Sequence, residues 1–186
     1  NVQFFSRDSS TPIWTDDPVG DAFVDVSSDG SLVAVGIRDY STRGLYLYGK
    51  YNDNPIWSDS WNGVSGVSDV KISEDGKYIF AVGDENSQNG LLLYSKDSSN
   101  YLWKIDFTRN IRANGLSISS DGNKIAVGAG DTSYSSYVSA IKNNLVSRPS
   151  IFAYGPRSGS EIGIPVLRWF AGSDDRSNLT FDAYLD

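Results

Sequence analysis

The sequence predicts an all-β fold built from repeated four-stranded antiparallel units, and three observations predict it. The first is the composition: the 186 residues include eleven Tyr, five Trp and 18 Gly. Aromatic residues favour half-buried strands and Gly favours turns. The second observation is a motif that ends in tryptophan and recurs along the chain. The third is an Asp-Gly motif that recurs between the tryptophans. The length suits one domain with one sizeable core.

The tryptophan motif is an apolar run that ends in an aromatic residue, then a polar turn, then a short apolar run that ends in tryptophan. Its clearest copy is residues 91–103. The pattern predicts two antiparallel strands joined by a turn, with the second strand ending at the tryptophan. Pro12 and Pro55 begin that last strand, where a sheet edge tolerates a missing N–H. The four tryptophans that hold this position are Trp14, Trp57, Trp103 and Trp169.

The Asp-Gly motif recurs every 46 residues and predicts a β-hairpin each time. Its three copies are Asp29-Gly30, Asp75-Gly76 and Asp121-Gly122. Asp-Gly favours the left-handed backbone of a tight hairpin, so we interpret these residues as turn residues. An alternating arm such as 24–26 precedes each pair, and a nearly continuous apolar arm such as 32–35 follows it. The second arm therefore resembles a strand that is buried on both faces.

One period thus contains four short strands in about 43–46 residues, which is typical of a β-propeller blade. We expect three complete blades and partial blades at both ends. Closing the ring with four blades would leave the composite blade without its second strand and expose edges. We therefore expect the chain to be part of a six- to eight-bladed propeller that missing sequence or another chain completes. The expected segments are the partial blade 1–14, blades over about 15–57, 58–103 and 104–169, and the partial blade 170–186.

The third blade carries an insertion at 131–149 and an enlarged turn at 155–165. The sequence places the next strand of this blade after the insertion, at 150–154. Within the insertion, Val138, Ile141 and Leu145 fit one face of a short helix. Insertions into repeats often mark a binding face, so both segments are candidate contact loops, and we expect the fold to survive deletion of 131–149. The residues proposed for contact are Tyr134, Tyr137, Ile141 and Leu145.

Together the two motifs resemble the repeats of PQQ-like and WD-repeat-like β-propellers. The tryptophan motif is similar to the tryptophan-docking motif of quinoprotein-type propellers, although Asn or Ser replaces the turn Gly in the first three copies and no Trp-Asp dipeptide occurs. This resemblance implies that each tryptophan packs between neighbouring blades. Quinoprotein dehydrogenases also hold their cofactor beside two adjacent cysteines and a calcium site. The chain has no Cys, so we expect no such cofactor.

The absence of Cys and His removes disulfides, thiol nucleophiles and Ser-His-Asp catalysis within this chain. Carboxylate pairs remain at 16–17, 84–85 and 174–175. Such pairs can serve acid–base chemistry or bind calcium, but their spacing matches no calcium loop. We interpret them as solvated charges in loops. The sequence therefore predicts no catalytic residue, no cofactor and no metal site.

The net charge of −7 and the scattered basic residues argue against binding to nucleic acid or anionic membrane. No apolar run is long enough to span a bilayer. Asn178-Leu179-Thr180 is a glycosylation acceptor pattern that matters only in an exported chain.

We expect a non-enzymatic structural or protein-binding propeller, such as a subunit of an extracellular cell-surface layer or filament, whose partners are other proteins or further copies. One alternative is a cytoplasmic interaction scaffold like many WD-repeat proteins. A second alternative is a hydrolase or lyase that uses loop carboxylates at the propeller channel.

Overall fold

The computed structural model describes residues 1–39, 42–85, 87–107, 111–131 and 136–142. Within these ranges the regular elements are thirteen β-strands. No helix in this part of the chain is long and apolar enough to cross a membrane.

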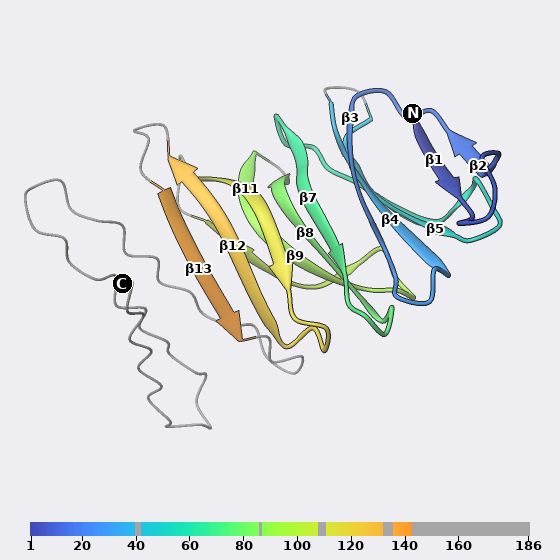
Figure 1. Ribbon diagram of the computed structural model, residues 1–186. Coiled ribbons are helices and arrows are strands. Elements are labelled where there is room, and N and C mark those ends of the chain that lie inside the picture. The colour runs from blue at the N-terminus through green and yellow to red at the C-terminus, as the bar shows by residue number, and fades with distance from the viewer. Residues whose placement is uncertain (40–41, 86, 108–110, 132–135, 143–186) are drawn as a thin grey trace, which may run out of the picture.

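The strands form four antiparallel sheets in which neighbours along the chain are neighbours in the sheet. Figure 1 shows these sheets in a row, with β1 and β2 at one end and β13 at the other. The two-stranded sheet contains β1 (Val2–Phe5) and β2 (Pro12–Asp16). The first four-stranded sheet contains β3 (Asp21–Val26), β4 (Leu32–Arg38), β5 (Gly44–Gly49) and β6 (Pro55–Ser60). The second contains β7 (Gly66–Ile72), β8 (Tyr78–Glu85), β9 (Gln88–Ser95) and β10 (Tyr101–Asp106). The three-stranded sheet contains β11 (Ile111–Ile118), β12 (Lys124–Asp131) and β13 (Ser136–Lys142).

The two complete sheets confirm the predicted all-β fold of four-stranded antiparallel blades. One detail of the prediction is wrong, because the fourth strand does not end at its tryptophan. Trp57 pairs with Leu47 in the middle of the β5–β6 ladder, and pairing continues to Ser60 opposite Gly44. The residues past Trp57 alternate between exposed and half-buried. This pattern suits an edge strand that pairs along the whole length of its neighbour.

Each apolar core lies between two consecutive sheets, because the second strand of each blade presents apolar residues on both faces. In β4, Val33 and Val35 face β1 and β2, whereas Ala34 belongs to the core shared with the next sheet. In β8, Ile79 joins the core with the preceding sheet and Phe80 joins the core with the following sheet. This alternation follows from the two-residue period of a strand. It explains why these arms read as continuous apolar runs.

The third blade departs from the expectation for residues 131–149. The predicted helix is wrong for 136–142, which form strand β13 beside β12. β13 holds the third-strand position that the sequence assigned to 150–154. A short connection costs little closure entropy, and the exposed backbone of β12 needs a partner strand. Deleting 131–149 would therefore remove a strand of the sheet instead of a loop.

The residues proposed for contact are thus divided. Tyr137 and Ile141 lie in β13. Tyr134, Leu145 and the enlarged turn at 155–165 lie outside the described residues, as do Trp169 and Asn178.

Candidate functional site: the junctions between blades

The three Asp-Gly turns share one construction, in which a serine two residues before the aspartate closes the turn. The Ser27 hydroxyl donates to Asp29 Oδ1 (2.7 Å), and the Ser31 N–H donates to the same oxygen (2.9 Å). Gly30 has φ of 66°, in the left-handed region that glycine adopts readily. The hydrogen bonds from Ser27 and Ser31 favour the charged carboxylate and lower the pKa of Asp29 to about 2.

The other two turns repeat this geometry. Ser73 donates to Asp75 (2.8 Å) and Ser119 donates to Asp121 (2.5 Å). Hydrogen bonding lowers the pKa of each carboxylate to about 2. The largest contribution comes from the Lys77 side chain at Asp75 and from the Ser119 side chain at Asp121. The carboxylates of the Asp-Gly motif therefore hold turns together.

The turns of consecutive blades also touch. A methyl group added at Gly76 would contact Ser27 of the preceding sheet at 3.6 Å, and one added at Gly122 would contact Ser73 at 3.4 Å. Nothing lies within 4 Å of the same position at Gly30. The second and third turns therefore each lie against the turn of the preceding blade, whereas no described residue lies beside Gly30 at this position.

Three junctions join the four sheets, and we name each after its tryptophan. At the Trp14 junction, between β1–β2 and β3–β6, the indole stacks on Tyr48 of the next sheet with ring centroids 5.1 Å apart. At the Trp57 junction, between β3–β6 and β7–β10, the indole stacks on Tyr94 at 5.7 Å. Trp57 Nε1 also donates to the Lys96 carbonyl (2.9 Å). Both tryptophans thus contact the third strand of the following blade, which supports a docking role.

The Trp103 junction joins β7–β10 to β11–β13. Trp103 is 6% exposed and packs in the core that contains Leu116, Ile125 and Val127 of the third sheet. Its indole N–H is buried without a hydrogen-bond partner among the described residues, as is that of Trp14. Trp103 therefore docks through apolar packing alone in the part of the chain that the structure describes.

A carboxylate two residues after the tryptophan binds the tyrosine of the next blade at two junctions. The Tyr48 hydroxyl donates to Asp16 Oδ2 (2.5 Å), and the Tyr94 hydroxyl donates to Asp59 Oδ2 (2.7 Å). The buried Trp61 indole donates to the Tyr94 oxygen (3.3 Å). Burial, and then the bond to the carboxylate, raises the pKa of both tyrosines. Burial also raises the pKa of Asp59.

The sequence has isoleucine at both positions of this pair in the repeat that follows Trp103. Ile105 stands two residues after Trp103, where the other junctions have aspartate. Ile141 of β13 pairs with Ile125 of β12, and Tyr94 of β9 pairs with Ile79 of β8 at the equivalent position of the preceding sheet. The repeat thus exchanges both members of the pair together, so that neither an unpaired aspartate nor an unpaired tyrosine is left at this position.

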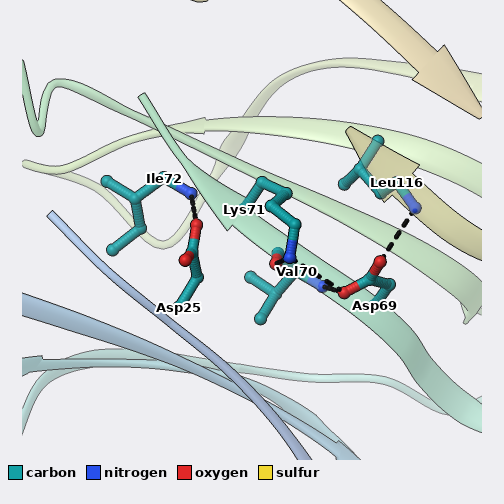
Figure 2. A network of polar contacts seen from close by, with 6 residues as sticks. All are labelled: Asp25, Asp69, Val70, Lys71, Ile72 and Leu116. Carbon is teal, nitrogen blue, oxygen red and sulfur yellow. Dashed lines mark hydrogen bonds and ion pairs between the residues drawn. The ribbon is translucent and has the colours of Figure 1, made fainter. Parts of the chain in front are cut away.

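A second set of carboxylates joins the innermost strands of the sheets (Figure 2). Asp25 Oδ2 of β3 accepts the Ile72 N–H of β7 (2.8 Å), and Asp69 Oδ2 of β7 accepts the Leu116 N–H of β11 (2.8 Å). Lys71 Nζ lies 3.5 Å from Asp69 Oδ1. Because β7 and β11 are edge strands of their sheets, these bonds satisfy N–H groups that have no hydrogen-bond partner in a neighbouring strand of the same sheet.

The carboxylate pair 84–85 is not the solvated loop charge that the sequence suggested. Asp84 and Glu85 end β8 and are 6% and 8% exposed. Asp84 Oδ2 accepts the N–H groups of Val64 and Ser65, at 2.8 and 3.2 Å. Lys104 Nζ lies 2.7 Å from Glu85 Oε2. The prediction fails because β8 is covered on both faces to its last residue. Of the other predicted pairs, Asp16 lies at the end of β2, and 174–175 lies outside the described residues.

Sequence reasoning missed the residues that make these junctions polar. One feature of the sequence could have identified Asp16 and Asp59: each follows a repeat tryptophan by two positions. Asp25 stands between Val24 and Val26, and Asp69 stands between Ser68 and Val70, so the available signal was an acidic residue beside valine on a predicted strand. Trp61 had none, because it lies outside the repeat. Among the described residues, no group of three or more acidic side chains could hold a metal ion.

Comparisons with known proteins support the fold only. No protein-family model and no curated protein matches the sequence. Among solved structures, the chain is similar to the hydrazine synthase of Kuenenia stuttgartiensis, a protein that contains a β-propeller. The TM-score is 0.55, the sequence identity is 16%, and the match covers 65% of this chain and 38% of that chain. The described sheets are therefore arranged like β-propeller blades.

Proposed function

We propose that this chain is a structural or protein-binding β-propeller and not an enzyme. The observation that carries the proposal is how its carboxylates are used. Asp29, Asp75 and Asp121 close turns. Asp16 and Asp59 bind tyrosines of the next blade, and Asp25 and Asp69 bind its backbone. A catalytic carboxylate must instead reach a substrate. These seven carboxylates serve the joining of strands and blades.

The composition supports a place for this propeller at the cell surface, in an extracellular layer or filament. The chain has no Cys, carries a net charge of −7, and is rich in Ser, Asp, Asn and Tyr. Such a surface remains soluble and does not depend on the redox state of its surroundings. The partners in this proposal are other proteins or further copies of the chain.

The experiment compares stability and turnover in one pair of variants. Asp16→Asn and Asp59→Asn are combined in one chain, with the exposed Asp53→Asn as the matched control. The proposal predicts a lower denaturation midpoint for the double variant and no turnover of esters, glycosides or acidic polysaccharides by any form. Turnover by the natural chain that the double variant loses at an unchanged midpoint would identify a carboxylate-dependent hydrolase or lyase instead.

A further inference from the structure

The loop between β6 and β7 contains an asparagine followed by a glycine, Asn62-Gly63. Asparagine is a thermolabile residue, and the backbone nitrogen that follows it can attack its side-chain carbonyl. A following glycine favours this attack, because it has no Cβ to hinder the approach. Two further Asn-Gly pairs lie at 89–90 and 114–115. The three Asp-Gly turns can in principle react in the same way, so six pairs must be compared.

The Asp-Gly turns are held in a form that resists the attack. In each turn the glycine N–H donates to the carbonyl of the turn serine at 2.8 Å: Gly30 to Ser27, Gly76 to Ser73 and Gly122 to Ser119. The aspartate pKa of about 2 keeps each carboxylate charged near neutral pH. A charged carboxylate is a poor electrophile and offers no good leaving group. We therefore expect these three pairs to remain unmodified.

Two of the Asn-Gly pairs lie inside strand ladders. Gly90 belongs to β9, which pairs with strands on both sides, and the Asn89 carbonyl accepts the Phe107 N–H (2.8 Å). Gly115 pairs with Gly128 in the β11–β12 ladder. Ring closure needs rotation of the backbone, so the ladder would have to open first. The sheets therefore protect both pairs.

Asn62-Gly63 differs from the other five pairs, because it lies in a loop. Asn62 is exposed, and neither its side chain nor the Gly63 N–H forms a hydrogen bond with the described residues. The loop joins the two complete sheets, all of whose strands are described. Its neighbours are anchored on both sides. The N–H of the buried Trp61 donates to the Arg43 carbonyl (3.2 Å), and the Gly63 carbonyl accepts the Arg43 guanidinium.

We propose that Asn62 is a site of spontaneous deamidation through a cyclic imide. The Gly63 nitrogen attacks the Asn62 side-chain carbonyl carbon, a C–N bond forms, the attacking nitrogen gives its proton to water, and the side-chain nitrogen leaves as ammonia. Water then opens the five-membered imide at either carbonyl. One opening gives aspartate on the original backbone, and the other gives isoaspartate, whose backbone runs through the side-chain methylene. One water is consumed and one ammonia is released, so the reaction needs no oxidant.

Isoaspartate at this position should loosen the Trp57 junction, because it adds one backbone atom between two anchors. Gly63 is buried, and a methyl group added there would overlap the Asp84 carbonyl, so the loop has no room to move towards β8. The longer loop cannot hold Trp61 and the N–H groups of Val64 and Ser65 in their places at once. Deamidation thus acts as a clock on this junction.

The test follows the full chain over time in mildly alkaline buffer at body temperature, by peptide mapping with mass spectrometry. We expect Asn62 to convert first, to a mixture of aspartate and isoaspartate that an isoaspartate-specific methyltransferase distinguishes. Asn89 is the matched control, since glycine follows it too. It should convert at least about tenfold more slowly, because its ladder must open first. A synthetic peptide of residues 58–67 gives the rate of the same pair without the fold.

Three results would overturn the proposal. An intact Asn62 in the chain, under conditions that convert the peptide, would mean that the fold protects this pair. Equal rates at Asn62 and Asn89 would mean that conversion follows global unfolding and that the loop is not selected. Aspartate without isoaspartate would exclude the cyclic imide.

Variants separate the chemistry from its effect on the junction. Asn62→Gln closes a six-membered ring far more slowly, so it should abolish conversion at an unchanged denaturation midpoint. Asn62→Asp adds the charge without the extra backbone atom and should also keep the midpoint. The purified isoaspartyl form should have a lower midpoint and exchange the Val64 and Ser65 amides at least about fivefold faster, because their bonds to Asp84 are lost. An isoaspartyl form with unchanged midpoint and exchange would refute the clock.

Discussion

The Trp57 junction and the Trp103 junction join the same central sheet to its two neighbours with different chemistry. At the first, Tyr94 binds Asp59 and the buried Trp61, and Trp57 donates to a backbone carbonyl. At the second, Trp103 and Ile105 pack into an apolar core, and the indole N–H has no partner among the described residues. The tryptophan is common to both junctions, and its surroundings change.

This difference shows which parts of the repeat are exchangeable. The stacking of one sheet on the next needs a large flat side chain on the outer strand, which tryptophan supplies at every described junction. The carboxylate and the tyrosine form a unit that is kept whole or replaced whole. Keeping one without the other would bury an unpaired polar group, at a cost of about 1–3 kcal/mol.

The largest effect that separates the two junctions should come from removing the indole. We expect Trp103→Ala to lower the free energy of unfolding by about 3–5 kcal/mol, because it leaves a cavity in an apolar core. Trp57 is only half-buried, so Trp57→Ala should cost less. Urea denaturation of both variants measures the difference. A larger loss for Trp57→Ala would show that the polar junction, not the apolar one, depends more on its tryptophan.

A smaller effect should come from the hydroxyl of Tyr94. Tyr94→Phe keeps the ring and removes the bond to Asp59, which leaves that half-buried carboxylate without this donor. We expect a loss of about 1–3 kcal/mol in the free energy of unfolding. Tyr101→Phe is the control, because this ring is 47% exposed. Equal losses in the two variants would mean that the polar pair does not stabilise the Trp57 junction.

The inner carboxylates should contribute less, because they are reached by solvent. Asp69→Ala leaves the Leu116 N–H of the next blade without its acceptor, and we expect a cost of about 1–2 kcal/mol. Faster hydrogen exchange at the Leu116 amide should accompany it. Asp53→Ala, in an exposed turn, should change neither quantity. A Leu116 amide that stays equally protected in Asp69→Ala would remove this bond from the account of the Trp103 junction.

The smallest effect is a dependence on pH with opposite signs in two places. The turn carboxylates have a folded pKa of about 2. This lies below the unfolded value of about 4, so they stabilise the fold above pH 4 and lose that contribution as the pH falls towards 2. Burial raises the folded pKa of Asp59, so its contribution to stability increases as the pH falls through that raised value.

Unfolding experiments between pH 2 and 7 on Asp121→Asn and Asp59→Asn separate the two signs. Asp121→Asn should flatten the acid limb of the stability curve, and Asp59→Asn should remove the gain near and above pH 4. Acid limbs that coincide for Asp121→Asn and the natural chain would contradict the role of the turn carboxylate.

Local patterns predicted the turns and strands well, because they depend on residues close in the chain. Asp-Gly fixes its own backbone, and the apolar run 32–35 shows a strand buried on both faces. The third blade was harder to predict from the sequence, because Val138 and Ile141 fit a helix as well as a strand. Residues 136–142 form a strand because they pair with β12, and this pairing depends on the tertiary structure and not on the local sequence.

The junctions were harder still, because their bonds join residues far apart in the sequence. The neighbours of Asp25 in the sequence mark it as unusual, but they do not show which backbone N–H its carboxylate accepts, because Ile72 lies 47 residues away. The burial of Asp84 depends on the loop that contains Val64, which the sequence does not place. The repeat pattern therefore predicts the strands and turns of each blade, but not the hydrogen bonds that join one blade to the next.

The most direct test of the stacked blades is a double-mutant cycle between Asp59 and Tyr94, which lie in different sheets. The free energy of unfolding is measured for the natural chain, Asp59→Ala, Tyr94→Phe and the combined variant. Contact between these residues across the Trp57 junction predicts a coupling energy of about 0.5–3 kcal/mol. Losses that add to within about 0.3 kcal/mol would contradict the contact, and with it the use of these carboxylates to join one blade to the next.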